Sequence, residues 1–482
     1  MPAMRVPLLL VTLVTLVSVA GIVPAIATEK PNVLFIISDD LTAEALSCYG
    51  NANCKTPAID ALAEKGLRFT RTYCQFPVCG PSRAALMSGM YPEAIGVTGN
   101  GSAGKFTAML GDRPSMSQHF IRNGYYAARV SKIYHMRVPG DITAGVDGPD
   151  HAASWTERFN FKAPEWMTEG ERFQLTNYKL NFDKDKHYNL GFGSAFYVVK
   201  GSSDGREQPD VRAADKAIEI MEQQKDGSFF LAVGLVRPHV PLVAPSEFYE
   251  PYPPENMILP EKHADDWNDI PKSGISMNSA ASGLEDPASQ RGVLSAYYAS
   301  VAFMDAQVGR IMAALDRLQL RERTIVVFTS DHGYHLGEHD FWQKMSLHEE
   351  STRIPLIVSV PGKAAAETAS LAEQIDIYPT LSELAGLDIP EHCQGVSLAD
   401  LMDDPQARKR DAIYCLRGKA QLVRTARFAF ISYGKGGSEL YDMEKDPRQL
   451  TNLAEDPAHA EVMARMRQRL EEKVKEIGTA AG

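Results

Sequence analysis

A chain of 482 residues is too long for one compact core and predicts one large domain with a smaller companion, or two to three modest domains. Hydrophobic residues make up 44% and charged residues 23% of the chain, an ordinary globular composition that excludes disordered, collagen-like and coiled-coil proteins. Its 50 basic and 61 acidic residues give a net charge of -11, which argues against a nucleic-acid partner. An anionic substrate must therefore meet a local basic pocket.

The first 27 residues have the pattern of a secretory signal peptide. Arg5 precedes an almost wholly apolar stretch over 6–19, and Ala25-Ile26-Ala27 has the small-x-small form of a signal peptidase site. We expect cleavage after residue 27 and export to a periplasm or to the outside of the cell. The alternative is an uncleaved anchor, because the apolar stretch is nearly long enough to span a bilayer. No later segment approaches ~18 consecutive apolar residues, so we expect no membrane association after cleavage.

Six cysteines in an exported chain are candidates for disulfides. They are Cys48, Cys54, Cys74, Cys79, Cys393 and Cys415. The pairs nearest in sequence are Cys48 with Cys54 and Cys393 with Cys415, although spacing alone does not decide connectivity.

Strands followed at once by polar residues recur along the chain. Residues 32–38 predict a buried parallel strand, and Asp39 and Asp40 follow it. Residues 56–65 predict a helix and 66–73 a second strand. Three further helix–strand units have the same form: 114–123 and 126–130 before Lys132, 212–224 and 228–236 before His239, and 292–318 and 324–330 before Asp331 and His332.

This alternation predicts an α/β fold with a large, mostly parallel sheet and helices on both faces. In such sheets ligands bind beyond the carboxyl ends of the strands, where the polar residues above are expected. Residues 139–289 contain one clear strand–helix unit in long irregular stretches, which we expect to line or cover the site. After residue 390 the pattern predicts a smaller α+β subdomain. We therefore expect a signal peptide over 1–27, a catalytic domain over 28–390 and a C-terminal subdomain over 391–482.

The most informative motif is Cys79-Gly80-Pro81-Ser82-Arg83, with Gly89 a few residues further on. A lone cysteine is usually structural. However, Cys-x-Pro-Ser-Arg resembles the signature at which type I sulfatases, in the alkaline phosphatase-like superfamily, have this cysteine converted to formylglycine. The resemblance implies a sulfuric ester hydrolase that depends on a formylglycine-generating maturation enzyme.

In that family the hydrated formylglycine supplies two hydroxyl groups. One attacks the sulfur of a sulfate ester and the other then expels sulfate, which splits a difficult displacement into two easier steps. A helix that starts at Pro81 would present free N–H groups and its positive dipole end to the sulfate. The resemblance assigns Arg83 to holding the diol.

The resemblance also implies a divalent cation held by Asp39, Asp40, Asp331 and His332 together with the modified Cys79. Paired aspartates suit a hard ion, and we expect one Ca²⁺ per chain. Alone, Asp-Asp after a strand is commonly a helix cap, but two acidic sites beyond separate strands of one sheet favour the metal. His332 departs from the family's commoner asparagine, and because nitrogen is an unusual calcium ligand, the identity of the metal stays open.

Four further residues resemble the family's groups for sulfate and the leaving group. Lys132 and His135, in Ser-Lys-Ile-Tyr-His, correspond to a lysine and a histidine that contact the sulfate and the diol. Lys344 corresponds to its second sulfate lysine. His239, in Arg-Pro-His-Val-Pro, corresponds to the histidine that protonates the departing oxygen, a role that suits a group titrating near neutral pH.

The resemblance covers nearly the whole mature chain. Within the family, residues 331–344, 132–135 and 237–241 are similar to those of the iduronate-2-sulfatase group, which removes the 2-O-sulfate of uronic acids in heparan and dermatan sulfates. This implies a sulfated oligo- or polysaccharide substrate. It also implies a second basic element for the uronate carboxylate, which the sequence does not identify.

Other interpretations stay open. The chain could be a sulfatase of another sulfated polysaccharide or of aryl sulfates. A phosphoryl or phosphonate monoester hydrolase would be favoured by a serine or threonine nucleophile, and Cys79 does not fit it. A catalytically dead, sulfated-glycan-binding protein would have lost the cysteine, aspartates or lysines, all of which are present. The joint occurrence of five ordered clusters argues against a purely structural role for them.

Overall fold

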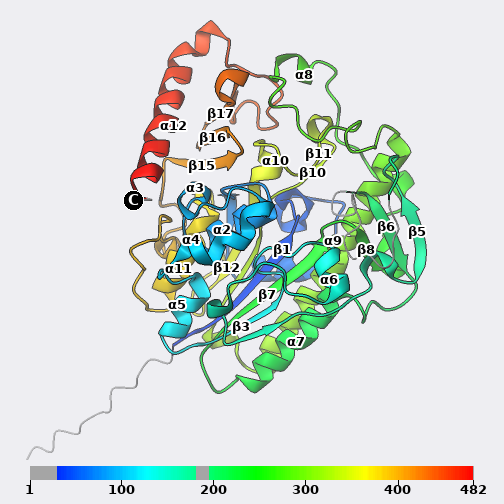
Figure 1. The fold of residues 1–482 in the computed structure, drawn as a ribbon, viewed down its shortest axis with the longest axis vertical. Coiled ribbons are helices and arrows are strands. Elements are labelled where there is room, and N and C mark those ends of the chain that lie inside the picture. The colour runs from blue at the N-terminus through cyan, green and yellow to red at the C-terminus, as the bar shows by residue number, and fades with distance from the viewer. Residues whose placement is uncertain (1–29, 181–194, 481–482) are drawn as a thin grey trace, which may run out of the picture.

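The computed structural model describes residues 30–180 and 195–480, so the signal segment predicted at 1–27 lies outside the described residues. A large sheet with strand order β13-β2-β12-β9-β1-β7-β3-β4 forms its centre, and β14 also pairs with β2 (Figure 1). The strands are β1 (Asn32–Asp39), β2 (Leu67–Tyr73), β3 (Tyr126–Ser131), β4 (Glu157–Phe159), β7 (Phe229–Pro238), β9 (Thr324–Ser330), β12 (Arg353–Ser359), β13 (Ala366–Thr368) and β14 (Ala372–Glu373).

The middle of this sheet is parallel. Strand β1 pairs in parallel with β7 and β9, and β3 pairs in parallel with β7 and β4, whereas β12 is antiparallel to β2 and β9. Every residue of β1 and β7 is buried, as expected for strands covered on both faces. The predicted fold class is confirmed.

Alternate residues of β1 pack into two separate cores. Leu34 and Ile36 contribute to one core with helices α1 (Pro57–Ala63), α7 (Pro209–Gln223) and α9 (Pro287–Arg317). Val33, Phe35 and Ile37 contribute to the other with α2 (Cys79–Ser88), α5 (Met116–Arg122) and α11 (Ile377–Leu384). The predicted helices and strands of this region are confirmed to within a few residues at their ends.

Short elements connect these layers. The short helices are α3 (Pro92–Ile95), α4 (Phe106–Leu110), α6 (Gly140–Ala144), α8 (Asp266–Asp269) and α10 (Glu349–Thr352). Strands β5 (Gly170–Gln174), β6 (Tyr197–Gly201) and β8 (Leu242–Pro245) form a three-stranded sheet within the stretch expected to be irregular. The sequence did not predict this sheet because its strands are short and β5 is largely exposed, so they lack the apolar alternation of longer strands.

The C-terminal region contains an antiparallel sheet in the order β15-β16-β17-β18, and α12 (Ala460–Ala480) packs near it (Figure 1). Its strands are β15 (Ala412–Arg417), β16 (Ala420–Thr425), β17 (Phe428–Ser432) and β18 (Ser438–Asp442). Met463, Met466 and Leu470 of α12 join the same core as β1 and α2. The expected α+β character is confirmed, while the boundary at 390 stays a prediction.

The six cysteines are all free thiols in this structure. Neither pair suggested by proximity in sequence, Cys48 with Cys54 or Cys393 with Cys415, is bonded. Across residues 30–180 and 195–480, none of the helices has the length and apolarity needed to span a membrane.

Candidate active site

Four neighbouring parallel strands, β9, β1, β7 and β3, deliver polar residues to one edge of the sheet. Asp331 and His332 follow β9, and Asp39 and Asp40 stand at the end of β1. His239 directly follows β7, and Lys132 directly follows β3. The sheet therefore gathers the clusters that lie up to about three hundred residues apart in sequence, as the rule for ligand sites in parallel sheets predicts.

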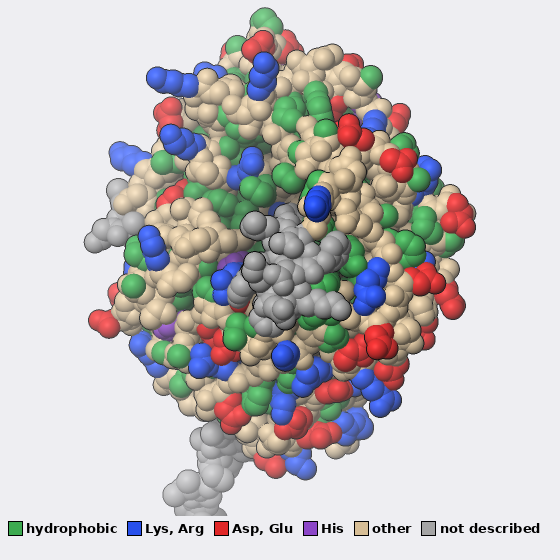
Figure 2. Space-filling view, turned by 45° about the vertical axis from the view of Figure 1, so that its right-hand side comes forward, with side chains coloured by type: hydrophobic (Ala, Val, Ile, Leu, Met, Phe, Trp, Pro, Cys, Tyr) green, Lys and Arg blue, Asp and Glu red, His purple; other side chains and the backbone are tan. Residues whose placement is uncertain are grey.

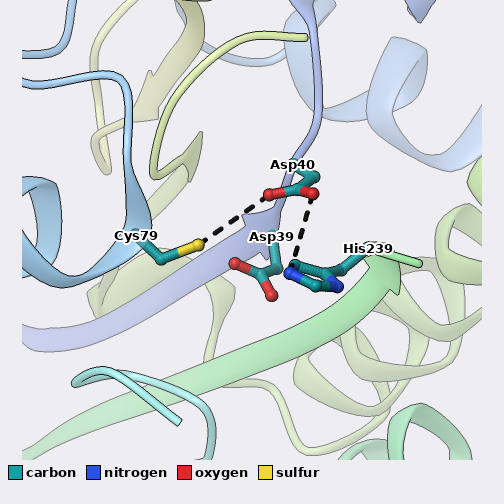
Figure 3. A group of neighbouring side chains, drawn as sticks. All are labelled: Asp39, Asp40, Cys79 and His239. Carbon is teal, nitrogen blue, oxygen red and sulfur yellow. Dashed lines mark hydrogen bonds and ion pairs between the residues drawn. The ribbon is translucent and has the colours of Figure 1, made fainter. Parts of the chain in front are cut away.

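Cys79 reaches this edge from α2. The helix begins at Cys79 itself, two residues before the start expected at Pro81, so the thiol lies at the positive end of the helix dipole. Its Sγ lies 3.4 Å from Nε2 of His332, 3.4 Å from Nζ of Lys344 and 3.9 Å from Oδ1 of Asp40. Figure 3 shows Cys79 pointing toward the aspartates at the end of β1.

The three aspartates are held in fixed positions. Asp39, Asp40 and Asp331 are at most 1% exposed. Asp40 has a positive φ of 63°, its N–H donates to Oδ1 of Asp331 (3.2 Å), and its carbonyl oxygen accepts from the hydroxyl of Tyr297 (2.7 Å). These contacts stabilise a backbone conformation that non-glycine residues seldom adopt.

The donor set fits a divalent cation. Nδ1 of His332 lies 2.9 Å from the carbonyl oxygen of Gly333 and must carry the proton, so Nε2 presents a lone pair. That Nε2 lies 3.3 Å from Oδ1 of Asp40 and 3.7 Å from Oδ2 of Asp331. Oδ2 of Asp40 has no hydrogen-bond partner among the described residues. These buried oxygen and nitrogen lone pairs are ligand atoms of the kind that a divalent cation binds.

Candidate ligand atoms form two overlapping groups, within each of which all atoms lie within 4.8 Å of one another. One contains Asp39, Asp40, Cys79 and His239, and the other contains Cys79, Asp331 and His332. His239 was not expected among the metal-ligand candidates. Its Nδ1 lies 2.6 Å from the carbonyl oxygen of Val240, and its Nε2 lies 3.7 Å from Oδ2 of Asp40.

Arg83 lies among the predicted metal ligands. Its Nε donates to Oδ2 of Asp331 (2.9 Å), and Nη2 donates to Oδ1 of Asp39 (3.0 Å). Nη1 donates to the carbonyl oxygens of Lys132 (2.7 Å) and Ile133 (3.1 Å). In this structure the guanidinium therefore fixes two carboxylates, and its contact with the diol stays a prediction.

Two lysines add positive charge. Nζ of Lys132 lies 2.5 Å from Oδ2 of Asp39, and Nζ of Lys344 lies 2.5 Å from Oδ1 of Asp40. Burial raises the pKa of Asp39, but the charges of Lys132, His239 and Arg83 outweigh it and hold that pKa well below its usual value. The carboxylate is therefore ionised at neutral pH.

His135 is 8% exposed, and its Nδ1 has no hydrogen-bond partner among the described residues. Burial, and then the charge of Lys132, lower its pKa to about 3. The imidazole is therefore neutral at physiological pH.

A cavity of about 810 Å³ opens onto this group. Its lining consists of Cys79, Asn100, Gly101, Gly104, His135, Met136, Arg137, Val138, Val146, Gly148, Pro149, His239 and Lys344. On the face drawn in Figure 2, basic and acidic side chains are interspersed. Lys344 and Arg137 place positively charged groups in the wall of this cavity.

A family model described as "Sulfatase" matches residues 31–387 and so contains every residue of this cluster. The chain belongs to the sulfatase family. A second model, "N-sulphoglucosamine sulphohydrolase, C-terminal", matches residues 337–476 of the sulfatase. Family membership makes the protein a sulfuric ester hydrolase, as predicted.

Two curated relatives and one solved structure illustrate the likeness. The sulfatase is 30% identical over 438 residues to a "Sulfatase" of Formosa agariphila, covering 88% of this chain and 83% of that one. It is 33% identical over 408 residues to the human "Iduronate 2-sulfatase", covering 76% and 71%. A phosphonate monoester hydrolase from Silicibacter pomeroyi shares the fold, with a TM-score of 0.75, 23% identity and 92% and 95% coverage.

Several residues of the site were not found from the sequence. Gln374 accepts from the hydroxyl of Ser82 (2.7 Å) and donates to the carbonyl oxygen of Ser330 (2.9 Å), so it ties α2 to the end of β9. Oδ1 of Asn100 accepts from the N–H of Gly80 (2.8 Å) at the start of α2. Arg137 lines the cavity and is paired with Asp141 at 2.9 Å. Isolated polar residues in irregular segments give no periodic signal.

Proposed function

We propose that this sulfatase removes the 2-O-sulfate of iduronate residues in a sulfated glycan, through a formylglycine made from Cys79 and with a divalent cation, Ca²⁺, in the cluster. The observation that carries the proposal is that two groups converge on Sγ of Cys79. Nζ of Lys344 and Nε2 of His332 each lie 3.4 Å from this sulfur. A neighbouring base, cation or metal ion activates a nucleophile, and a fixed positive charge stabilises the anionic oxygens of the reacting group.

Two groups that this chain would acquire supply the central chemistry. A hydrated formylglycine at position 79 provides one hydroxyl for attack at sulfur and a second for release of sulfate, and a bound cation provides Lewis acidity. The cation would be held by Asp39, Asp40, Asp331 and His332, because their ligand atoms already lie close to one another. We propose calcium because three of these four ligands are carboxylates, which calcium prefers. The nitrogen of His332 is the least typical ligand for this ion.

The remaining residues bind and orient the ester. Lys132 and Lys344 place ammonium groups at the cluster, and neutral His135 can donate one hydrogen bond to a sulfate oxygen. Arg83 fixes Asp39 and Asp331. His239 directs Nε2 toward Asp40, because its Nδ1 donates to the carbonyl oxygen of Val240, so in the imidazolium form the proton on Nε2 would be available to the departing sugar oxygen.

The substrate class rests on the relative and on the cavity. The human protein named iduronate 2-sulfatase is 33% identical over 76% of this chain. The cavity of about 810 Å³ is large enough for more than one sugar ring. Arg137 in its wall is the candidate for the second basic element that a uronate carboxylate requires, because an arginine fork pairs well with carboxylates.

The test is desulfation of 2-O-sulfated iduronate disaccharides against 6-O-sulfated glucosamine disaccharides. The proposal predicts sulfate release from the first and little from the second. Release only from the 6-O-sulfated compound, or only from aryl sulfates, would reject the iduronate assignment while keeping the sulfatase. An Arg137→Met variant should raise KM for the iduronate substrate and leave KM for an aryl sulfate unchanged.

We also propose that the chain is exported and reaches its substrate in a periplasm or outside the cell after loss of residues 1–27. The apolar stretch and the Ala25-Ile26-Ala27 site support this. A maturation enzyme that converts Cys79 is the second proposed partner. N-terminal sequencing of the protein from its own organism would show whether the mature chain begins at Thr28.

A further inference from the structure

Arg237 is a buried arginine two residues before His239, and the mechanism above gives it no role. It is 1% exposed and stands in β7. Its Nη1 donates to the carbonyl oxygen of His239 (2.8 Å) and to that of Pro241 (2.9 Å). These carbonyls flank Val240, whose own carbonyl oxygen accepts from Nδ1 of His239 at 2.6 Å. One guanidinium nitrogen therefore joins the carbonyl oxygens at both ends of the segment 239–241, which carries the histidine.

Two buried carboxylates hold the side chain and the backbone of Arg237. Nη2 of Arg237 lies 2.5 Å from Oε2 of Glu165, which is 0% exposed. Asp210, also 0% exposed, accepts from the N–H groups of Val236 (2.7 Å) and Arg237 (3.0 Å). Burial alone would lower the pKa of Arg237, but the charges of Glu165 and Asp210 outweigh it and raise that pKa. The guanidinium is thus a fixed cation.

We infer that Arg237, anchored by Glu165, is a positioning residue that fixes the loop, the ring orientation and the tautomer of His239. With the backbone held at His239 and Pro241, the carbonyl of Val240 stays within reach of Nδ1. That hydrogen bond keeps the proton of the neutral ring on Nδ1 and directs Nε2 toward Asp40 and the cavity. The kinetic consequence rests on the proposed role of His239 as the acid, whereas the structural consequence does not.

The arrangement requires an arginine. Its planar fork contacts two carbonyl oxygens through Nη1 and a carboxylate through Nη2. A lysine has a single ammonium group, which cannot occupy both positions. Arg237→Lys should therefore keep the charge while releasing either the loop or Glu165.

The direct test is the ¹⁵N–¹H spectrum of the imidazole groups in histidine-labelled protein, with His239→Ala used to assign the signals of His239. At a pH high enough for the imidazole to be neutral, His239 of the wild type should show a protonated Nδ1 and an unprotonated Nε2. In Arg237→Lys these signals should shift toward a mixture of tautomers. An unchanged Nδ1–H signature in a folded Arg237→Lys protein would overturn the inference, whatever reaction the enzyme catalyses.

Kinetics then separate this inference from the proposed acid role. Arg237→Lys should lower kcat/KM for the glycan substrate about 10- to 100-fold. For nitrophenyl sulfate the loss should be no more than about 3-fold, because that leaving group needs no proton. If the tautomer changes but both substrates lose equally, and His239→Ala does the same, His239 is not the acid while the positioning role stands.

Two more variants guard against a folding defect. Glu165→Gln keeps the size and one acceptor oxygen, so it should shift the His239 signals in the same direction but less than Arg237→Lys. Arg424→Lys is the matched control: Arg424, in β16 of the C-terminal sheet, is 5% exposed and pairs with Glu349 of α10 at 2.7 Å. It should leave the His239 signals and the ratio of the two substrates unchanged. Equal shifts in Arg424→Lys and Arg237→Lys would reject the specific link to His239.

Discussion

The ammonium group of Lys344 lies 2.5 Å from Oδ1 of Asp40, while its Nζ also lies 3.4 Å from Sγ of Cys79. Burial would lower the pKa of Lys344, but Asp40 and its neighbours outweigh this and raise that pKa. A permanent cation therefore contacts both a candidate metal ligand and the proposed nucleophile.

Lys344→Met should lower kcat/KM for sulfate esters by about 10²-fold or more, because it removes a preorganised positive charge from the reacting group. The measurement is sulfate release under conditions of low substrate. Lys262→Met is the control, since Lys262 is half-exposed, pairs with Asp340 and does not line the cavity. Near-normal turnover by Lys344→Met would remove Lys344 from the site.

His239→Ala should slow the release of sugar alcohols much more than that of nitrophenol, because only a poor leaving group needs a proton in the transition state. The ratio of kcat/KM values for the two substrates measures this. Equal losses for both leaving groups would exclude His239 as the acid.

Gly333→Ala should disturb the candidate metal site by displacing the backbone next to His332. A Cβ at this position would lie 2.0 Å from the carbonyl oxygen of Glu350 and 2.8 Å from that of Arg353, so the segment that carries His332 must move. We expect a loss of about 1–3 kcal/mol in the free energy of unfolding, together with a weaker rise of Tm on addition of Ca²⁺. Gly478→Ala, which has open space around it, should cause neither effect.

Asp305 predicts a pH dependence of stability. It is buried in α9 and accepts from the N–H groups of Ala58 (3.1 Å) and Ile59 (2.9 Å), and burial raises its pKa to about 7 from 3.8. The folded protein therefore holds a proton that the unfolded chain releases, so the contribution of Asp305 to stability is present below pH 3.8 and is lost as the pH rises to about 7.

Urea unfolding at a series of pH values checks this, with wild type compared against Asp305→Asn. The difference in free energy of unfolding should fall across that window as the pH rises. A difference in free energy of unfolding that does not change with pH for Asp305→Asn would contradict the buried, proton-holding role.

Asp286 is the opposite case. The N–H groups of Ala288 and Ser289 lower its pKa, so its contribution to stability should be lost on acidification.

Much of the site was predictable because its residues directly follow strong strand patterns. The parallel order of the sheet is enough to bring together Asp39 at the end of β1, Lys132 after β3 and Asp331 after β9. Glu165 lies 72 residues from Arg237 in an irregular segment, and no local pattern indicates their contact. The role of Gln374 was not predicted for the same reason, because Gln374 contacts Ser82 only in the folded chain.

The start of α2 was misplaced for a different reason. Pro81 fits the first position of a helix, yet the helix begins at Cys79, where the extended Val78 acts as the N-cap. Proline is tolerated throughout the first turn, because the N–H groups there have no partner within the helix. This shift brings the thiol itself to the helix terminus.

The central claim is that Cys79 is the precursor of the nucleophile, and the most direct test is the mass of the peptide that contains Cys79, from protein purified out of its own organism. Formylglycine formation predicts the lower mass of an aldehyde in place of the thiol, and no sulfate release by Cys79→Ala with its fold intact. An unmodified thiol in fully active protein, or wild-type turnover by Cys79→Ala, would contradict it.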